Sequence, residues 1–385
     1  MISCLPGNAV SLLENGEHYF PALQAAIEVA EREIFLQSYI FEDDATGQGI
    51  AAALVRAAGR GVVVRVMVDG FGGRSFVARL MPSLVEQGVQ VLIYRRELRM
   101  LSLRRHRLRR LHRKLVVIDG REAFVGGINI VDDLDADGPP HPRYDYAVHV
   151  RGPILEPIVA SAHRLWRLVA WASFRRREHQ PLLAPPQTDV AGDIRAAFVL
   201  RDNLRFRHAI EDAYLDAIGR ARHEIVIANA YFFPGGRFRQ ALVEAAARGV
   251  RITLLLQGLA DHPLQRYATR ALYPYFLSRG IRLFEYHRSH LHAKVAVVDG
   301  RWATVGSSNI DAFSLLLARE ANVVIEDSSF ARQLRASLER AICSGAQELR
   351  PSDWRRLSLL QRGLNWISYQ LVRLAIGFAG YRGKH

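Results

Sequence analysis

One cluster of polar residues occurs twice in this 385-residue chain. Each copy has a histidine, a lysine two positions later, an aspartate after four further apolar residues, and an asparagine 17 positions after the histidine. The corresponding members, 180 positions apart, are His112 and His292, Lys114 and Lys294, Asp119 and Asp299, and Asn129 and Asn309. An imidazole can act as a nucleophile or exchange protons, while a fixed cation and an amide stabilise charge on phosphoryl oxygens. The clusters therefore predict phosphoryl-transfer chemistry, with the histidines, lysines and aspartates as catalytic candidates and the asparagines as phosphate-binding candidates.

The local sequence predicts how these side chains come together. A histidine and a lysine two positions apart lie on the same face of a strand, because side chains alternate along it. The four apolar residues continue that strand into the core, and the Asp-Gly pairs at 119–120 and 299–300 end it in a turn. A second strand, over 123–126 or 303–306, then returns the chain and brings the asparagine beside the histidine and lysine.

Simpler explanations exist for each element taken alone. A single His-x-Lys is usually a surface feature, and a single Asp-Gly is usually only a turn. Two copies at identical spacing favour a functional site. Zinc binding is the rival explanation for the histidines, but no second histidine or cysteine recurs at ligand spacing in both halves, and the lysine would repel the metal. We therefore expect neither a metal nor a cofactor.

The elements around the clusters are duplicated too. Helical-period segments at 22–32 and 210–222 each precede a buried strand, at 33–36 and 224–227. A second helix then ends at a glycine, Gly61 or Gly249, which leads into apolar strands at 62–68 and 250–256 and further strands at 88–94 and 280–286. The order matches while the loops differ, so the sequence predicts an α/β fold made of two similar units, each a sheet flanked by helices.

The length suits two domains of ordinary size. A basic run and three prolines between Arg175 and Gly192 have the composition of a linker. We therefore predict an N-terminal domain at 1–175, a linker at 176–192, a C-terminal domain at 193–350 and a tail at 351–385. The two cysteines, Cys4 and Cys343, make a disulfide framework improbable, and no signal peptide or spanning segment is visible, which predicts a soluble or peripherally attached protein.

The charge predicts an anionic partner. The chain has 52 Lys and Arg against 38 Asp and Glu, a net charge of +14. A basic, leucine-containing segment at 95–114 runs into the first cluster, and either an anionic lipid or a nucleic-acid backbone would suit it. In the tail, apolar residues recur at steps of three and four, which predicts a helix that either lies in a membrane interface or packs on its own domain. They are Leu360, Leu364, Ile367, Leu371, Leu374 and Phe378.

The doubled His-x-Lys-x4-Asp pattern with Gly-(Gly/Ser)-x-Asn resembles the signature of the phospholipase D superfamily. The stretches at 12–16, 110–114, 228–235 and 302–309 are most similar to the short, B-type bacterial cardiolipin synthases. The resemblance spans nearly the whole chain. It implies two similar phospholipase D-like domains, each a mixed β-sheet flanked by helices, related by a pseudo-twofold axis and sharing one active site.

The resemblance also implies a mechanism. One histidine, taken to be His112, attacks the phosphodiester of phosphatidylglycerol and forms a phosphohistidine, while His292 serves as the general acid and base. A second phosphatidylglycerol then accepts the phosphatidyl group. The residues expected to hold the phosphoryl oxygens are Lys114, Lys294, Asn129, Asn309 and Ser307.

Two acids follow the clusters at comparable places, each before an apolar strand: Asp145 and Glu320. The resemblance implies that each orients the histidine of its own half by binding the second ring nitrogen. The alternative for each is a surface acid at the start of a strand.

Three functions remain open from the sequence. A phosphatidyltransferase that makes cardiolipin is favoured over a hydrolase of phospholipid or nucleic acid, and over a non-catalytic binding protein, because both clusters are intact. The expected partners are anionic phospholipid, in particular phosphatidylglycerol, and a membrane surface; nucleic acid is disfavoured. We expect a peripheral location on the cytoplasmic face of a bacterial membrane, and the sequence makes no prediction of oligomeric state.

Overall fold

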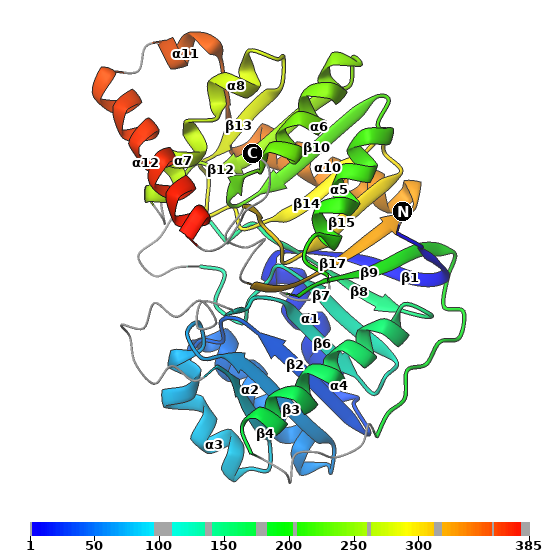
Figure 1. The fold of residues 1–385 in the computed structure, drawn as a ribbon. Helices are drawn as coiled ribbons and strands as arrows, with labels where there is room; N and C mark the ends of the chain where they lie inside the picture. Colours follow the sequence, from blue (N-terminus) through cyan, green and yellow to red (C-terminus); the bar gives the residue numbers. More distant parts are fainter. Residues whose placement is uncertain are drawn as a thin grey trace.

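The computed structural model describes residues 2–95, 110–134, 141–174, 183–202, 206–259, 263–311, 318–355 and 358–378. Two halves of matching topology are joined through one continuous mixed sheet (Figure 1). The first half supplies β1 (Leu5–Glu14), β2 (Glu33–Ser38), β3 (Val63–Asp69), β4 (Gln90–Tyr94), β6 (Lys114–Ile118), β7 (Glu122–Gly126) and β8 (Tyr146–Arg151). The second half supplies β9 (Ile194–Arg201), β10 (Glu224–Asn229), β12 (Arg251–Gln257), β13 (Arg282–Tyr286), β14 (Lys294–Val298), β15 (Trp302–Gly306) and β17 (Ala318–Glu326).

The strand order is the same in both halves when each is followed from its edge to the middle. It is β4-β3-β2-β6-β7-β8-β1 in the first half and β13-β12-β10-β14-β15-β17-β9 in the second, where β18 (Ala346–Leu349) is added at the edge. Strands β2, β3 and β4 are parallel, and β6, β7 and β8 are antiparallel to their neighbours, as are their counterparts. The antiparallel pair β1–β9 joins the halves at the pseudo-twofold axis.

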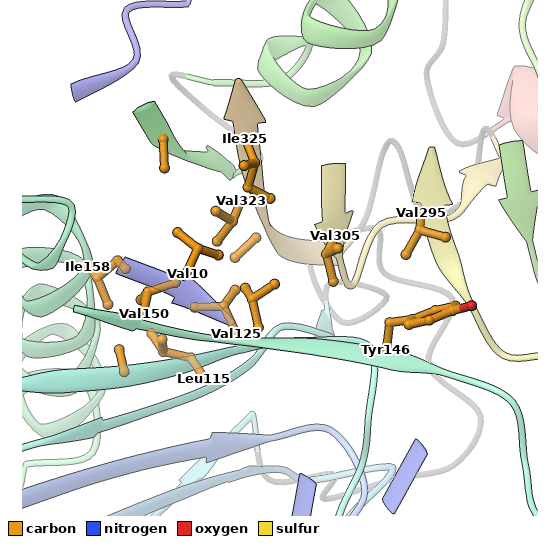
Figure 2. Close-up of a cluster of buried hydrophobic side chains, with 14 of the residues drawn as sticks. Val10, Leu115, Val125, Tyr146, Val150, Ile158, Val295, Val305, Val323 and Ile325 are labelled. Atoms are coloured by element: carbon orange, nitrogen blue, oxygen red, sulfur yellow. The ribbon is translucent and has the colours of Figure 1, made fainter. Parts of the chain in front are cut away.

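The halves also pack face to face. Strand β7 lies against β15 and β17, and β8 lies against β15. Figure 2 shows that hydrophobic side chains of the two halves meet in one cluster. From the first half these include Val10, Leu115, Val125, Tyr146 and Val150, and from the second half Val295, Val305, Val323 and Ile325. The helices α4 (Leu155–Ala172) and α10 (Ser328–Gly345) contribute to the same cluster. The site residues therefore project from a rigid base that both halves share.

Other helices cover the outer faces of the sheet. In the first half these are α1 (Asn15–Glu28) and α2 (Ala45–Gly59), with η1 (Phe76–Leu80) and α3 (Met81–Glu86) nearby. In the second half they are α5 (Ala209–Arg220), α6 (Gly236–Ala247) and α8 (Tyr273–Leu277). Because both faces are covered, every residue of β2 and β14 is buried.

The structure confirms the predicted α/β class and the duplicated mixed sheet flanked by helices. Gly61 and Gly249 follow the helices as predicted, with φ of +90° and +85°, which an L side chain rarely adopts. The turns at Asp119-Gly120 and Asp299-Gly300 are present as well, with positive φ at all four residues.

The predicted linker at 176–192 is described only from residue 183 onward. That part runs along the first half: the backbone N–H groups of Leu183 and Ala184 donate to Glu33 Oε2, at 3.2 and 3.3 Å, and Gln187 N donates to the oxygen of Gly120 at 2.8 Å. The division into separate domains stays a prediction. Most of the basic segment at 95–114 lies outside the described residues.

Candidate active site

Both histidines predicted to be catalytic lie just before a central strand and are held by the backbone of the opposite half. His112 lies two positions before Lys114, the first residue of β6. Its N–H donates to the oxygen of Arg319 at 3.0 Å. His292 occupies the same place before β14, and its N–H donates to the oxygen of Tyr144 at 2.8 Å. The short strand β5 (Arg110–Leu111) pairs with the start of β17, which extends this contact between the halves.

The two predicted acids contact the histidines, but in a crossed arrangement. His112 Nδ1 lies 3.0 and 3.1 Å from the carboxylate oxygens of Glu320, and His292 Nδ1 lies 2.6 Å from Asp145 Oδ2. The prediction that each acid serves the histidine of its own half is therefore wrong. The reason is the backbone pairing: the residue before each acid binds the backbone of the opposite histidine, so the acid side chain meets the opposite ring.

The two acids are supported differently. Ser307 Oγ donates to Glu320 Oε2 at 2.5 Å, and Ser307 is fully buried. The structure thus places this hydroxyl on the acid, and its role in phosphate binding stays a prediction. In the first half the matching residue is Gly127, where an added Cβ would lie 2.3 and 2.6 Å from the carboxylate oxygens of Asp145. The shorter acid therefore requires a glycine beside it, and the longer acid accepts a serine.

The lysines are buried next to the histidines. Lys114 Nζ donates to the backbone oxygen of His112 at 2.7 Å, and Lys294 Nζ donates likewise to the oxygen of His292. Lys294 Nζ also lies 3.8 Å from Asp145 Oδ2. Burial and the charge of Lys294 lower the pKa of Lys114 to about 7. Because the charge of Lys294 disfavours the ammonium form of Lys114, an anion bound near both lysines would be favourable.

The ionisation of the acids and of His292 follows from the same crowding. Burial and the charge of Lys294 lower the pKa of His292 to about 3, although Asp145 acts in the opposite direction. Burial alone would raise the pKa of both acids, but cations beside them outweigh it, so the pKa values of Asp145 and Glu320 lie below their ordinary range. His292 is therefore neutral, and both acids are carboxylates, near pH 7 without a ligand.

The asparagines of the motif are also buried at the site. Asn129 is 5% exposed, and its Oδ1 accepts a hydrogen bond from the N–H of Ile40 at 3.2 Å. Asn309 is 3% exposed, and its Oδ1 has no hydrogen-bond partner among the described residues. The amide N–H groups are the donors that these side chains can offer to a phosphoryl oxygen. Within the described ranges, no three His, Cys, Asp or Glu side chains gather as ligands of a metal ion would.

The structure does not bring Asp119 and Asp299 to the site, which corrects their predicted catalytic role. They end β6 and β14, five residues beyond each lysine and thus about 16 Å away at the rise of a strand. The Asp119 carboxylate accepts from the N–H groups of residues 31, 32 and 33 at 2.7–2.8 Å. The Asp299 carboxylate accepts from those of residues 222, 223 and 224 at 2.8–2.9 Å. Each aspartate thus fixes the turn that leads into β2 or β10.

We therefore expect Asp119→Ala to destabilise the fold without impairing the chemistry. Three backbone N–H groups would lose their acceptor, at a cost of about 1–3 kcal/mol. For a chain of this size we expect Tm to fall by several degrees, measured by circular dichroism, while turnover per folded molecule at 20 °C stays within about twofold. The control is Asp189→Ala, an exposed aspartate. A loss of turnover without a loss of Tm would return Asp119 to the catalytic set.

Comparison with known proteins identifies the family. The family described as "Cardiolipin synthase, PLD-like domain" matches residues 23–133 and 214–342. Cardiolipin synthase B of Escherichia coli (strain K12) is 42% identical over 352 residues, which cover 89% of this chain and 82% of that protein. The chain belongs to the bacterial cardiolipin synthases of the phospholipase D superfamily. Cardiolipin synthase A of Pseudomonas aeruginosa (strain LESB58) is 34% identical over 360 residues, 93% of this chain and 71% of that protein.

Solved structures with the same fold extend beyond the cardiolipin synthases. Phosphatidylserine synthase of Haemophilus influenzae Rd KW20 superposes with a TM-score of 0.71 at 13% identity, covering 98% of this chain and 96% of that one. Polyphosphate kinase of Porphyromonas gingivalis gives 0.58 at 16% identity, covering 96% of this chain and 53% of that one. At such identities the likeness shows the fold alone, and it confirms the predicted two-half architecture.

Sequence reasoning missed three residues of this cardiolipin synthase site. The ring of Tyr39 lies 4.9 Å from that of His112, centroid to centroid. Asp69 Oδ2 accepts from the N–H of Leu111 at 2.8 Å, and Gln257 Oε1 accepts from that of Leu291 at 3.1 Å, so each holds the residue before a histidine. The sequence did contain a signal for Asp69 and Gln257. Each is a polar residue directly before a glycine, at the end of one of two matching apolar strands.

Proposed function

We propose that this protein makes cardiolipin by transferring the phosphatidyl group of one phosphatidylglycerol to another, with release of glycerol. The observation that supports this most directly is the interlocked pair of His-Lys-Asn clusters in a member of the cardiolipin synthase family. Each histidine has its Nδ1 occupied by a carboxylate, which leaves Nε2 for the substrate. Two such nitrogens are what a two-step transfer needs.

In the first step, His112 Nε2 attacks the phosphorus of phosphatidylglycerol. The N–P bond forms and the bond from phosphorus to the glycerol oxygen breaks, while protonated His292 gives its proton to that oxygen. Glu320 stabilises the positive charge that develops on His112. The ammonium groups of Lys114 and Lys294 and the amides of the asparagines stabilise the charge on the non-bridging oxygens.

In the second step, the phosphatidyl group passes from His112 to the acceptor. Neutral His292 removes the proton from the primary hydroxyl of a second phosphatidylglycerol, and that oxygen attacks the phosphorus. The N–P bond to His112 breaks, and cardiolipin leaves, with the proton of the acceptor hydroxyl now on His292. If water replaces the acceptor hydroxyl, the same groups produce phosphatidic acid, so exclusion of water decides between transfer and hydrolysis.

The proton on His292 depends on the substrate in this scheme. Burial and the charge of the neighbouring Lys294 lower the pKa of His292, so the free imidazole is neutral. An anionic phosphodiester between Lys114 and Lys294 offsets that charge, and Asp145 then favours the imidazolium. Substrate binding thereby supplies the general acid that the first step requires.

We therefore expect an oxyanion to bind with net uptake of protons. With a pKa of about 7, the free Lys114 is mostly uncharged at pH 8, whereas the bound form is charged. Titration calorimetry with tungstate at pH 8, in two buffers of different ionisation enthalpy, should show uptake of about half a proton or more. Affinity should fall as pH rises above 7, by up to about tenfold per unit. In Lys114→Met both effects should shrink; unchanged uptake in that variant would contradict the assignment.

The test of the proposed function is the identity of the product. Purified protein is incubated with phosphatidylglycerol in detergent micelles, and the lipids are identified by mass spectrometry. Cardiolipin with an equal amount of glycerol is the expected result. Phosphatidic acid without cardiolipin would overturn the proposal in favour of a phospholipase.

The membrane association of the enzyme is part of the same proposal. A net charge of +14 and a lipid substrate support action at an anionic membrane surface, which we place on the cytoplasmic side. None of the helices in the described part of the chain is long and apolar enough to cross a bilayer. Vesicle binding that is insensitive to the content of anionic lipid would contradict the electrostatic part of this proposal.

A further inference from the structure

The C-terminal helix α12 (Leu359–Phe378) packs on the protein through a narrow, largely polar face. It lies along α7 (Pro263–Arg270) on the outside of the second half (Figure 1). The side chains of Asn365, Ser368 and Val372, one turn apart, are the buried ones, at 4–6% exposure. This face, rather than the apolar stripe of the sequence, attaches the helix to its own domain.

The apolar stripe points away from the protein. Its members Leu360, Leu364, Ile367, Leu371 and Leu374 are 40–74% exposed. They recur at steps of three and four, so they form one continuous band on the helix. Trp366 is also exposed, at 62%, and lies about 80° around the helix from the edge of the band. The side chain of Phe378, the sixth predicted member, lies outside the described residues. The sequence left open whether this stripe lies in a membrane interface or packs on its own domain. Their exposure excludes the second possibility for these five residues.

We infer that this stripe is the element by which the enzyme enters the surface of an anionic lipid bilayer. The helix contains Arg362 and Arg373 and no acidic residue, and residues 351–385 hold six Lys and Arg against one Asp. At 100° per residue the two arginines lie within about 20° of each other, on the face of the helix roughly opposite the stripe. An apolar band on one face of a helix, with arginines on the opposite face, is typical of a helix that lies in the plane of a membrane interface.

The attachment of the helix links it to the catalytic site. The ring of Tyr369 lies 5.4 Å from that of Phe233, and Arg239 Nη1 lies 3.3 Å from the Tyr369 hydroxyl. Phe233 belongs to β11 (Phe232–Phe233), which pairs with β16 (Ile310–Asp311), the strand directly after Asn309. In Figure 1 the C-terminal end of α12 is directed toward the junction of the two halves. The helix that carries the stripe is therefore connected, through β11 and β16, to the segment that directly follows Asn309.

The experiment replaces three central residues of the stripe in the full-length chain: Leu364→Ser, Ile367→Ser and Leu371→Ser together. The matched control replaces three exposed apolar residues of the first half: Val29→Ser, Val85→Ser and Leu168→Ser. Co-sedimentation with vesicles of equal parts phosphatidylglycerol and phosphatidylcholine should show about 30-fold weaker binding for the stripe variant. The control variant should bind like the unmodified protein, and both variants should keep their far-UV circular dichroism.

This inference rests on the proposed function for the role of the lipid, but the two can fail separately. In detergent micelles the stripe variant should make cardiolipin within about twofold of the unmodified rate, because the catalytic residues are untouched. Absence of cardiolipin from the unmodified protein would refute the proposed function and leave the vesicle result standing. Unchanged vesicle binding by the stripe variant would overturn the inference. So would sedimentation showing that the stripe instead joins two copies of the chain, with vesicle binding unaffected when they separate.

Discussion

Cardiolipin formation should fall by at least about four orders of magnitude when either His112 or His292 is replaced by asparagine. Both rings are needed in both steps of the proposed cycle, since one carries the phosphatidyl group and the other moves the proton. Groups that act as a unit are not additive, so the double variant should lose little more than either single one. The measurement is conversion of labelled phosphatidylglycerol per folded molecule, with His18→Asn, an exposed histidine, as the control.

The same variants assign the two roles when the leaving group is changed. A phosphatidyl ester of p-nitrophenol needs no proton on its leaving oxygen, so the general acid is dispensable in the first step. His292→Asn should then release nitrophenol in a burst and retain a phosphatidyl group on His112, visible by mass spectrometry of protein denatured at mildly alkaline pH, where the N–P bond survives. His112→Asn should show neither. A phosphatidyl group found on His292 in His112→Asn would reverse the assignment.

Much of the local structure could be predicted because it depends on short-range patterns. The histidine and the lysine, with four apolar residues after them, specify a strand, and Asp119-Gly120 specifies the turn that ends it. The same pattern 180 positions later predicts the same hairpin again, and Gly61 and Gly249 mark matching helix ends. None of these inferences needed the position of a residue distant in sequence.

The contacts between the halves could not be predicted, because they depend on strand order. The pair β1–β9 joins the two sheets, and nothing in either segment distinguishes it from another edge strand. The crossing of the acids follows from backbone pairing between Arg319 and the residues at His112, which no local pattern shows. Motif membership was misleading for Asp119: it accompanies the histidine in sequence but serves the turn at the far end of the strand.

The crossed pairs predict different losses for the two acids. Glu320→Gln should lower cardiolipin formation by about 10²- to 10⁴-fold, because His112 loses the carboxylate that fixes its tautomer and stabilises its charge. Asp145→Asn should have a loss of the same order through His292. Gly127→Ser should resemble Asp145→Asn, since its side chain would displace that carboxylate, whereas Ser307→Ala should cost only about tenfold or less.

The nitrophenyl ester separates positioning of each histidine from a general loss of structure. Asp145→Asn should recover most of the first-step rate with this ester, because it impairs only the general acid. Glu320→Gln should remain slow, because it impairs the nucleophile. With phosphatidylglycerol, the basic limb of the pH profile of Asp145→Asn should move to lower pH, since the carboxylate raises the pKa of His292. If each acid instead served the histidine of its own half, the ester would rescue Glu320→Gln and would not rescue Asp145→Asn. That outcome would refute the crossed arrangement.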